Sequence, residues 1–289
     1  MVVSKRSAER LGKVFVYTSA TLAVLIFMIP ILWTISSSLK TAAQFVAYPP
    51  VWLPDPIVWG NYVRVWQVVP FALYVRNSFL VAIPVLVGRL LVSSLVAYGF
   101  ARFRFRGREA LFMLMLGTMM LPQVVTLVPE FLIFKHLGWI NTFLPLIVPS
   151  FLGIGPGGAF TIFVFRQFFM SLPMEFDEAA RIDGAGPLRI YWNIILPLSK
   201  PAFAAVAIFT FLFTWNDYLG PMIYLNSKET FTIPLGLTNF QYYSAHTAQE
   251  PMLNLLMVAA LIMTIPVVVI FLLGQKHFVR GMTLGGLKG

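Results

Sequence analysis

The chain has 289 residues, of which 58% are hydrophobic and 11% are charged, and its formal net charge is +10. A soluble domain cannot bury that much apolar surface, so the composition excludes an ordinary soluble protein and predicts one embedded in a bilayer. The positive charge does not predict nucleic-acid binding, because most Lys and Arg residues stand in short clusters at the ends of apolar segments. The chain has no cysteine, which excludes a disulfide framework and thiol chemistry.

Six apolar stretches each reach the length of about 20 residues that a helix needs to cross a bilayer core. We place them near 14–38, 78–100, 110–134, 142–165, 202–225 and 253–275. The first follows a basic segment, as a secretory signal does, but its apolar run is longer than a signal core, so an uncleaved anchor is predicted. The sequence therefore predicts an all-α, polytopic membrane protein with six transmembrane helices. Its N-terminus is 1–13, its transmembrane domain 14–280 and its C-terminal tail 281–289.

The distribution of Lys and Arg predicts the orientation. With the N-terminus inside, fifteen of these residues fall in inner connections and five in outer ones, namely Lys40, Arg64, Arg76, Lys135 and Lys228. Cytoplasmic loops carry an excess of Lys and Arg. We therefore expect a multi-pass protein of a bacterial or archaeal cytoplasmic (inner) membrane, with both termini in the cytoplasm.

Two connections have an unusual composition. Segment 101–108 alternates Arg with Phe, a pattern that a nucleic-acid site could share. At a membrane edge, however, Arg meets lipid phosphates and Phe lies at the interface, so we interpret the segment as a lipid contact, with no nucleic-acid partner. The outer segment 48–66 is rich in Pro and Trp, which predicts an ordered cap on the outer surface.

A polar stretch at 178–197, EAARIDGAGPLRIYWNIILP, lies between two apolar ones. Glu178, Ala179 and Ala180 favour a helix, Gly184 permits a turn at low steric cost, and Pro197 disfavours continuation of a helix. A helix, a sharp turn and a second short helix are therefore predicted at the membrane surface.

The spacing of this stretch resembles the EAA motif of ABC importer permease subunits: EAA, three residues, Gly, nine residues, Ile, one residue, Leu-Pro. From about Trp52 onward the chain is similar to the six-helix (MalG-like) permease of maltose-type sugar importers. The supporting pieces, in the same order, are Asn77-Ser78, Ala97-Tyr98, Leu137-Gly138, Arg166-Gln167-Phe168-Phe169, Pro197-Leu198-Ser199-Lys200-Pro201, Trp215-Asn216 and the Gly-rich tail. The resemblance implies the type I ABC importer permease fold, with a cytoplasmic coupling helix in a coupling loop at 171–201.

The resemblance also implies a division of labour. The sequence contains no GxxxxGK[ST] loop, so the chain is expected not to be an enzyme and to hold no cofactor, with ATP and Mg²⁺ in a partner ATPase. The implied partners are a second permease subunit (MalF-like), homodimeric ATPase subunits, an extracytoplasmic solute-binding protein and membrane lipid. The implied substrate is a sugar, such as an oligosaccharide or disaccharide, and this chain would form half of the pore.

In such a permease the coupling loop docks on the ATPase. Glu178 and Asp183 would accept hydrogen bonds from basic groups there, Ala179 and Ala180 would permit close approach, and Gly184 would provide the turn. The downstream motif positions are Ile194, Leu196 and Pro197. The alternative interpretation is an ordinary amphipathic interfacial helix.

The tail is expected to reach between the ATPase monomers, because the resemblance extends to it. Gly281, Gly285 and Gly286 suit a backbone in a narrow gap, since glycine has neither bulk nor a restricted φ. The alternative is a frayed terminus.

Polar residues inside the apolar stretches are candidates for the substrate pathway, because each is costly in lipid. Gln123, Thr126 and Glu130 have the spacing of one helical face. A second polar group is found later in the chain, comprising Thr214, Asn216 and Asp217. Such a lining suits sugar hydroxyls, and the alternative is that both faces contact the partner permease.

Arg89 stands near the centre of the second stretch, too deep to reach the interface easily. We expect it to pair with a carboxylate or to face water. The carboxylate could be that of Asp217 or Glu130, or could belong to a residue of the partner subunit. Two other functions stay open: a permease for glycerol phosphate or another polyol derivative, and an ion-coupled secondary transporter. A metal site is not predicted, because the three His residues are scattered.

Overall fold

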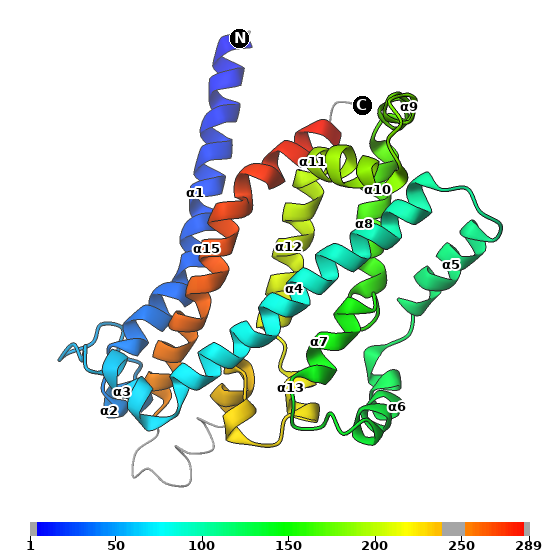
Figure 1. Ribbon diagram of the computed structural model, residues 1–289. Helices are drawn as coiled ribbons and strands as arrows, with labels where there is room; N and C mark the ends of the chain where they lie inside the picture. Colours follow the sequence, from blue (N-terminus) through cyan, green and yellow to red (C-terminus); the bar gives the residue numbers. More distant parts are fainter. Residues whose placement is uncertain (1–4, 239–251, 286–289) are drawn as a thin grey trace. The chain divides into compact units, whose positions relative to one another are not determined.

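The computed structural model describes residues 5–238 and 252–285, and the regular elements within those ranges are all helical. This confirms the predicted all-α class for the described residues (Figure 1). The chain divides into two compact units, one of Met1–Pro70 with Leu237–Thr264 and one of Phe71–Gly236 with Ile265–Gly289.

The first unit contains α1 (Lys5–Ser38), α2 (Ala42–Val46), α3 (Asn61–Val68) and the first part of α15 (Leu253–Gly285). The backbone carbonyl of Lys40 is buried in this unit and links α3 to α15. It accepts hydrogen bonds from Asn61 Nδ2 at 2.9 Å and from Asn254 Nδ2 at 3.0 Å. The Lys40 ammonium lies 3.7 Å from the centroid of the Trp33 ring. Burial lowers the pKa of this ammonium, because desolvation disfavours its charged form.

The predicted outer cap lies in this unit. Its Trp52 ring meets Trp33 of α1 edge-on, with centroids 5.0 Å apart. Ser36 Oγ donates a hydrogen bond to the Trp52 carbonyl. The Pro- and Trp-rich segment is therefore held against the end of α1.

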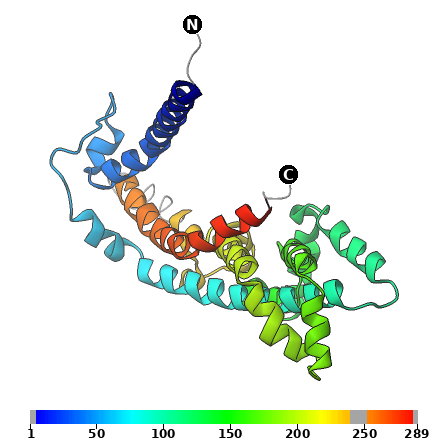
Figure 2. The ribbon, with the colours of Figure 1, turned by 90° about the horizontal axis from the view of Figure 1, so that it is seen from above.

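The second unit is built around α4 (Phe71–Arg102), which packs against α7 (Leu144–Phe151), α8 (Gly158–Ser171) and α12 (Lys200–Trp215) (Figure 1). Close packing with α7 requires Gly88, because a Cβ there would lie 2.7 Å from Ser150 Oγ. The other elements are α5 (Arg108–Thr118), α6 (Gln123–His136), α9 (Glu175–Ile182), α10 (Pro187–Ile190), the π-helical turn η1 (Tyr191–Ile195), α11 (Leu196–Leu198), α13 (Leu219–Tyr224) and η2 (Lys228–Thr230). In both views α5 and α6 lie at the edge of this unit (Figure 2).

The six apolar stretches all form helices, but only three are uninterrupted helices of spanning length: Gly12–Ser38, Phe71–Arg102 and Leu253–Gly274. The stretch at 110–134 is divided between α5 and α6, and the chain bends by 95° between these two helices. Pro122 immediately precedes α6 with an extended backbone, and proline disfavours a helical residue before it. Counting each bent pair as one span gives up to five spans among the described residues.

The stretches at 142–165 and 202–225 are divided too. The first separates into α7 and α8, and the loop between them contains Gly153, Gly155 and Gly157, all with positive φ. Side chains disfavour that left-handed conformation, so glycine is the residue that permits such a turn. The second divides into α12 and α13, and α12 itself meets the preceding helical segment Pro187–Leu198 at 78°.

Candidate functional site

The segment 171–201 forms the predicted helix, turn and second helical stretch. Three acidic residues in the first turn of α9 favour that helix end, since they face the positive end of the helix dipole. Gly184, at φ 76°, makes the turn, and α10 then begins at Pro187, whose fixed φ suits a first helical position. The π-helical turn η1 comes next, just before Pro197, whose nitrogen donates no hydrogen bond to the preceding turn.

The 171–201 segment rests on an apolar core shared with α4, α8 and α12. Phe165, Phe169, Tyr191 and Ile195 are each fully buried in this core. Ala180, one of the motif residues, is buried in the same cluster. The small side chain of Ala180 therefore packs inward against the membrane helices rather than outward.

Polar bonds also attach the 171–201 segment to α4. Ser94 Oγ lies 2.6 Å from the hydroxyl of Tyr191, and the Tyr98 hydroxyl donates to the carbonyl of Pro187 at 3.1 Å. Arg102 Nη2 donates to the carbonyl of Leu172 at 3.1 Å.

Arg102 also forms a buried ion pair with the helix that begins the segment. Its Nη2 lies 3.4 Å from Asp177 Oδ2, and the two side chains are only 2% and 1% exposed. The interpretation of Arg102 as a lipid-phosphate contact is therefore wrong, because its guanidinium is enclosed by protein. Its neighbours Arg104 and Arg106 are exposed.

The remaining motif residues face outward to different degrees. Glu178, Ala179, Asp183, Gly184 and Pro197 are exposed. Ile194 and Leu196 are half-buried. Large apolar side chains stand among them, with Ile182 87% exposed and Leu188 66% exposed. The outer face of the 171–201 segment is thus a mixed apolar and charged surface, on which Glu178 and Asp183 stand with the exposed Arg181 and Arg189.

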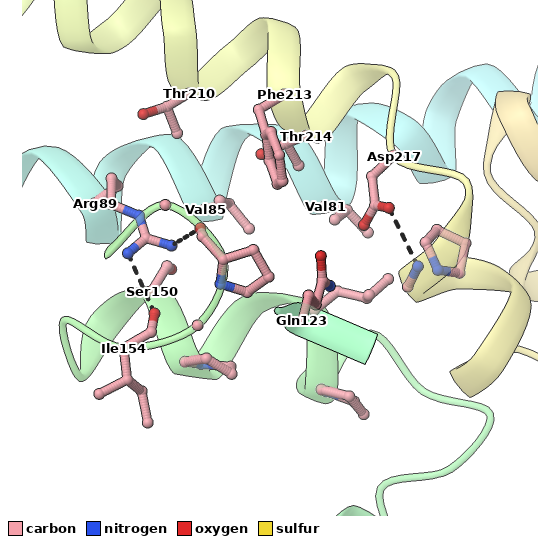
Figure 3. A pocket seen from close by; sticks show the side chains of 18 of the residues that line it. Val81, Val85, Arg89, Gln123, Ser150, Ile154, Thr210, Phe213, Thr214 and Asp217 are labelled. Atoms are coloured by element: carbon pink, nitrogen blue, oxygen red, sulfur yellow. Dashed lines mark hydrogen bonds between the residues drawn. The ribbon is translucent and has the colours of Figure 1, made fainter. Parts of the chain in front are cut away.

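A second candidate site is a cavity of about 460 Å³ in the second unit. Figure 3 shows the cavity from close by, with Arg89 and Asp217 at opposite sides of the view. Its polar lining comes from α4, α6, α7, α8, α12, α13 and the nearby loops, as Ser78, Arg89, Gln123, Glu130, Ser150, Thr161, Thr210, Thr214, Asp217, Tyr224 and Thr232. Aromatic rings of Phe134, Phe160, Phe209 and Phe213 line it as well. Hydroxyl, amide and carboxylate groups beside aromatic rings suit a small polyhydroxylated ligand.

Arg89 is 5% exposed and binds backbone oxygens in the loop between α7 and α8. Its Nη1 donates to the carbonyl of Ile154 at 3.2 Å and its Nη2 to the carbonyl of Pro156 at 2.9 Å (Figure 3). The ion pairs found among the described residues do not include Arg89, so of the two expected environments, a carboxylate or water, the first is not found there, and the side chain lines the cavity. The carbonyl dipoles orient the guanidinium but carry no net charge to neutralise it.

The predicted pathway residues divide between the cavity and its surroundings. Gln123, Glu130, Thr214 and Asp217 line the cavity, and Asp217 Oδ1 accepts a hydrogen bond from the backbone N–H of Gly220 at 3.2 Å. Thr126 donates instead to the carbonyl of Gln123 at 3.1 Å and is not part of the lining. Asn216 donates to the carbonyl of Leu212 at 2.8 Å and is likewise outside the lining.

The predicted tail is helical where it is described. Gly281 and Gly285 belong to α15, so the helix continues past the expected start of the tail. Gly286 lies outside the described residues. The role expected of these glycines at an ATPase interface stays a prediction.

Sequence reasoning missed Asp177, Tyr98 and Ser94 as members of either site. Ser94, Tyr98 and Arg102 follow one another at intervals of four residues, which places their side chains on one face of α4. This spacing could have been read from the sequence. Their partners stand 70 or more residues later in the chain. Among the described residues no group of three or more His, Cys, Asp or Glu residues could hold a metal ion.

Comparison with known proteins places the chain among transport proteins. Residues 90–284 match the family described as binding-protein-dependent transport system inner membrane component. The chain is 34% identical over 288 residues to the sn-glycerol-3-phosphate transport system permease protein UgpE of Yersinia pestis bv. Antiqua (strain Antiqua), covering 98% of each. It is 33% identical over 283 residues to the trehalose/maltose transport system permease protein MalG of Thermococcus litoralis, covering 97% of this chain and 99% of that one.

A solved structure shares the fold. It belongs to a bacterial ABC transporter involved in the import of the acidic polysaccharide alginate, and one of its chains superposes with a TM-score of 0.80 at 24% identity. The superposition covers 96% of this chain and 99% of that chain. The fold is therefore that of an ABC importer permease, as the EAA spacing predicted.

Proposed function

This chain belongs to the binding-protein-dependent transport system inner membrane components, and from that membership we propose that it forms half of the translocation pore of an ATP-driven sugar importer. As a member of that family it is a multi-pass membrane permease subunit of an ABC importer and not the enzyme that hydrolyses ATP. The observation that carries the proposal is the 171–201 segment, which exposes Glu178 and Asp183 while its other face is built into the core of the second unit.

The exposed face of this segment suits an ATPase partner. Ile182 and Leu188 present apolar surface to solvent, and Glu178 and Asp183 stand beside them. Exposed apolar side chains within a polar rim are the usual composition of a protein interface. We infer homodimeric ATPase subunits that bind ATP and Mg²⁺, a second, MalF-like permease subunit and an extracytoplasmic solute-binding protein. In this assembly the 171–201 segment and both termini face the cytoplasm.

Support for a sugar substrate comes from the cavity. Carboxylate and amide groups of Glu130, Asp217 and Gln123 can exchange hydrogen bonds with hydroxyls, and Phe209 and Phe213 provide rings for the apolar face of a pyranose. The MalG relative transports trehalose and maltose by its name. The substrate pathway proposed here comprises Gln123, Glu130, Thr214 and Asp217.

A second candidate substrate is glycerol phosphate or another anionic polyol. The UgpE relative is a glycerol-3-phosphate permease by its name, and Arg89 places on the cavity wall a guanidinium whose hydrogen bonds, within the described part of the chain, go to two carbonyls. A phosphate group would neutralise that charge. Reconstituted protein tested with solute-binding proteins loaded with disaccharides or with glycerol phosphate distinguishes the two substrates by which one stimulates ATP hydrolysis.

The docking proposal is tested by Glu178→Lys with Glu175→Lys as a matched control. Both residues are exposed on α9, and both changes reverse one charge, but only Glu178 belongs to the EAA motif. We expect Glu178→Lys to abolish transport and ATPase co-purification while the amount of protein in the membrane stays unchanged, and Glu175→Lys to retain both. Normal transport by Glu178→Lys would contradict the docking assignment.

A further inference from the structure

The ion pair between Arg102 and Asp177 is poorly explained as a device for stability. Both side chains are almost fully enclosed, and removing two charges from water costs more than their attraction usually returns. An apolar pair of the same size would hold the two helices together at least as well. Among the described residues Asp177 Oδ1 and Oδ2 make no hydrogen bond, so the carboxylate is directed at Arg102 by the ion pair alone.

The position of the pair is more informative. Asp177 lies in the first turn of α9, immediately before the exposed Glu178 of the EAA motif. Arg102 is the last residue of α4. The pair therefore joins the part of the 171–201 segment nearest the proposed ATPase surface to one end of the longest helix of the second unit.

Two further contacts repeat this connection along the same face of α4. Tyr98, one turn before Arg102, binds the carbonyl of Pro187 at the start of α10, and Ser94, another turn before, binds the hydroxyl of Tyr191 in η1. All three α4 residues are buried. The three contacts engage α9, α10 and η1, so the 171–201 segment is attached to α4 at points on both sides of its turn.

The other part of α4 lines the cavity through Ser78, Val81, Val85 and Arg89. From Arg102 to Arg89 is about 20 Å along the helix axis, at the rise of an α-helix. The proline inside α4 is Pro84, so no proline interrupts the helix between these two arginines. A continuous hydrogen-bonded helix transmits displacement of one end to the other as a rigid element.

We propose that the buried Arg102–Asp177 pair, supported by Tyr98 and Ser94, transmits movement of the 171–201 segment through α4 to the Arg89 side of the cavity. This inference rests on the proposed function, in which an ATPase moves that segment. Asp177 and Arg102 are positioning residues: both side chains are enclosed by protein, and neither lines the cavity. Their effect is on the coupling between ATP hydrolysis and transport.

The test measures transport per ATP hydrolysed in proteoliposomes that contain the complete importer and its loaded solute-binding protein. Asp177→Asn removes the charge and keeps the shape. We expect it to lower transport per ATP hydrolysed about tenfold, within the usual range of coupling between sites, while complex assembly is retained. The charge-exchanged double variant Arg102→Asp with Asp177→Arg is expected to recover part of the loss. The control is Glu109→Gln, which also removes the charge of a paired carboxylate. The Glu109 side chain is 61% exposed, and its Oε1 lies 3.3 Å from Arg166 Nη2. This change should leave the amount of transport per ATP hydrolysed unchanged.

Tyr98→Phe combined with Ser94→Ala provides a second measurement, because it removes both hydroxyl contacts and leaves the ion pair and the packing of the ring in place. It should lower the same ratio by a smaller factor. An unchanged ratio in both Asp177→Asn and the hydroxyl variant overturns the inference, as does a loss of transport in strict proportion to the amount of assembled complex. Failure of the wild-type chain to associate with an ATPase would instead contradict the proposed function itself.

Discussion

Arg89 and Arg102 are carried by the same helix and buried to a similar extent, at 5% and 6% exposure, but their partners differ in kind. Arg102 faces a carboxylate of α9, so its charge is compensated within the protein. Arg89 faces two backbone carbonyls of a glycine-rich loop and the cavity. The comparison shows how one helix uses the same residue type in two ways: to hold the 171–201 segment at one end, and to present a positive charge to a cavity nearer its middle.

The difference has an energetic consequence. Removing one member of a compensated buried pair leaves the other charge without a counterion, whereas removing Arg89 leaves neutral carbonyl groups beside a cavity that water can enter. Substitutions at the Arg102 end should therefore affect the stability of the fold and the coupling of transport to ATP hydrolysis. Substitutions at the Arg89 end should mainly affect how the substrate is bound. Four changes test this distinction.

The largest effect is expected for Arg102→Ala. It leaves Asp177 buried and unpaired, which should lower the free energy of unfolding in detergent by about 3–5 kcal/mol. The double variant Arg102→Met with Asp177→Leu removes both charges and should return close to the wild-type value. Chemical denaturation followed by Trp fluorescence measures both, and a double variant as unstable as the single one would show that the ion pair itself stabilises the fold.

Arg89→Ala should have a smaller effect on stability, about 2–3 kcal/mol, because the carbonyls of Ile154 and Pro156 lose their donors but water from the cavity can replace them. The same change should alter the substrate concentration dependence of transport, because it removes a positive charge from the cavity wall. Denaturation and initial uptake rates are measured on one preparation. A larger loss of stability than that of Arg102→Ala would reverse the comparison.

Gly158→Ala tests the loop that holds Arg89. A Cβ there would lie 2.6 Å from Arg89 Nη1 and 2.6 Å from the carbonyl oxygen of Gly153, so both of these groups must move. We expect a loss of about 1–3 kcal/mol in unfolding free energy, the usual range for overpacking, because the arginine side chain can turn aside but the Gly153 carbonyl belongs to the backbone. Gly99→Ala on α4 is the control: its Cβ would meet nothing within 4 Å, and it should stabilise the helix slightly.

The smallest effect is expected for Ser94→Ala. It removes the buried hydrogen bond to Tyr191 together with the local bond to the carbonyl of Leu90, and should lower the unfolding free energy by about 0.5–1.5 kcal/mol. Ser171→Ala removes an exposed local bond to the carbonyl of Phe168 and serves as the reference. Equal melting temperatures for the two variants would argue that the Ser94 contact adds nothing to the attachment of the 171–201 segment.

Local features of the 171–201 segment were predictable because local residues decide them. Helix formers precede Gly184, the glycine permits a left-handed turn, and Pro187 suits the start of the next helix. Hydropathy likewise located the six apolar stretches, since burial in lipid requires apolar side chains whatever their exact packing. Hydropathy alone did not locate the breaks within three of them, because an average over many residues does not register single residues such as Pro122 and Gly153.

Partners far apart in the chain could not be predicted in the same way. The sequence marked Arg89 as a buried cation that would pair with a carboxylate or face water. The structure places it on the cavity wall, but its bonds go to two carbonyls of the loop between α7 and α8, which the sequence did not indicate. The sequence also marked Thr126 and Asn216 as lining residues, but these side chains bond the carbonyls of Gln123 and Leu212, one turn earlier in the chain, and neither lines the cavity.

By itself, the sequence determined the helical class, the membrane setting, the positions of the apolar stretches and the EAA-type segment, because propensity, hydrophobic length and motif spacing act over a few turns of chain. Only the tertiary structure decided that Asp177 pairs with Arg102 and that Arg89 turns toward a glycine-rich loop. Both outcomes depend on α4 packing against α7, α8 and the 171–201 segment, which brings together groups 65 to 75 residues apart and removes them from water.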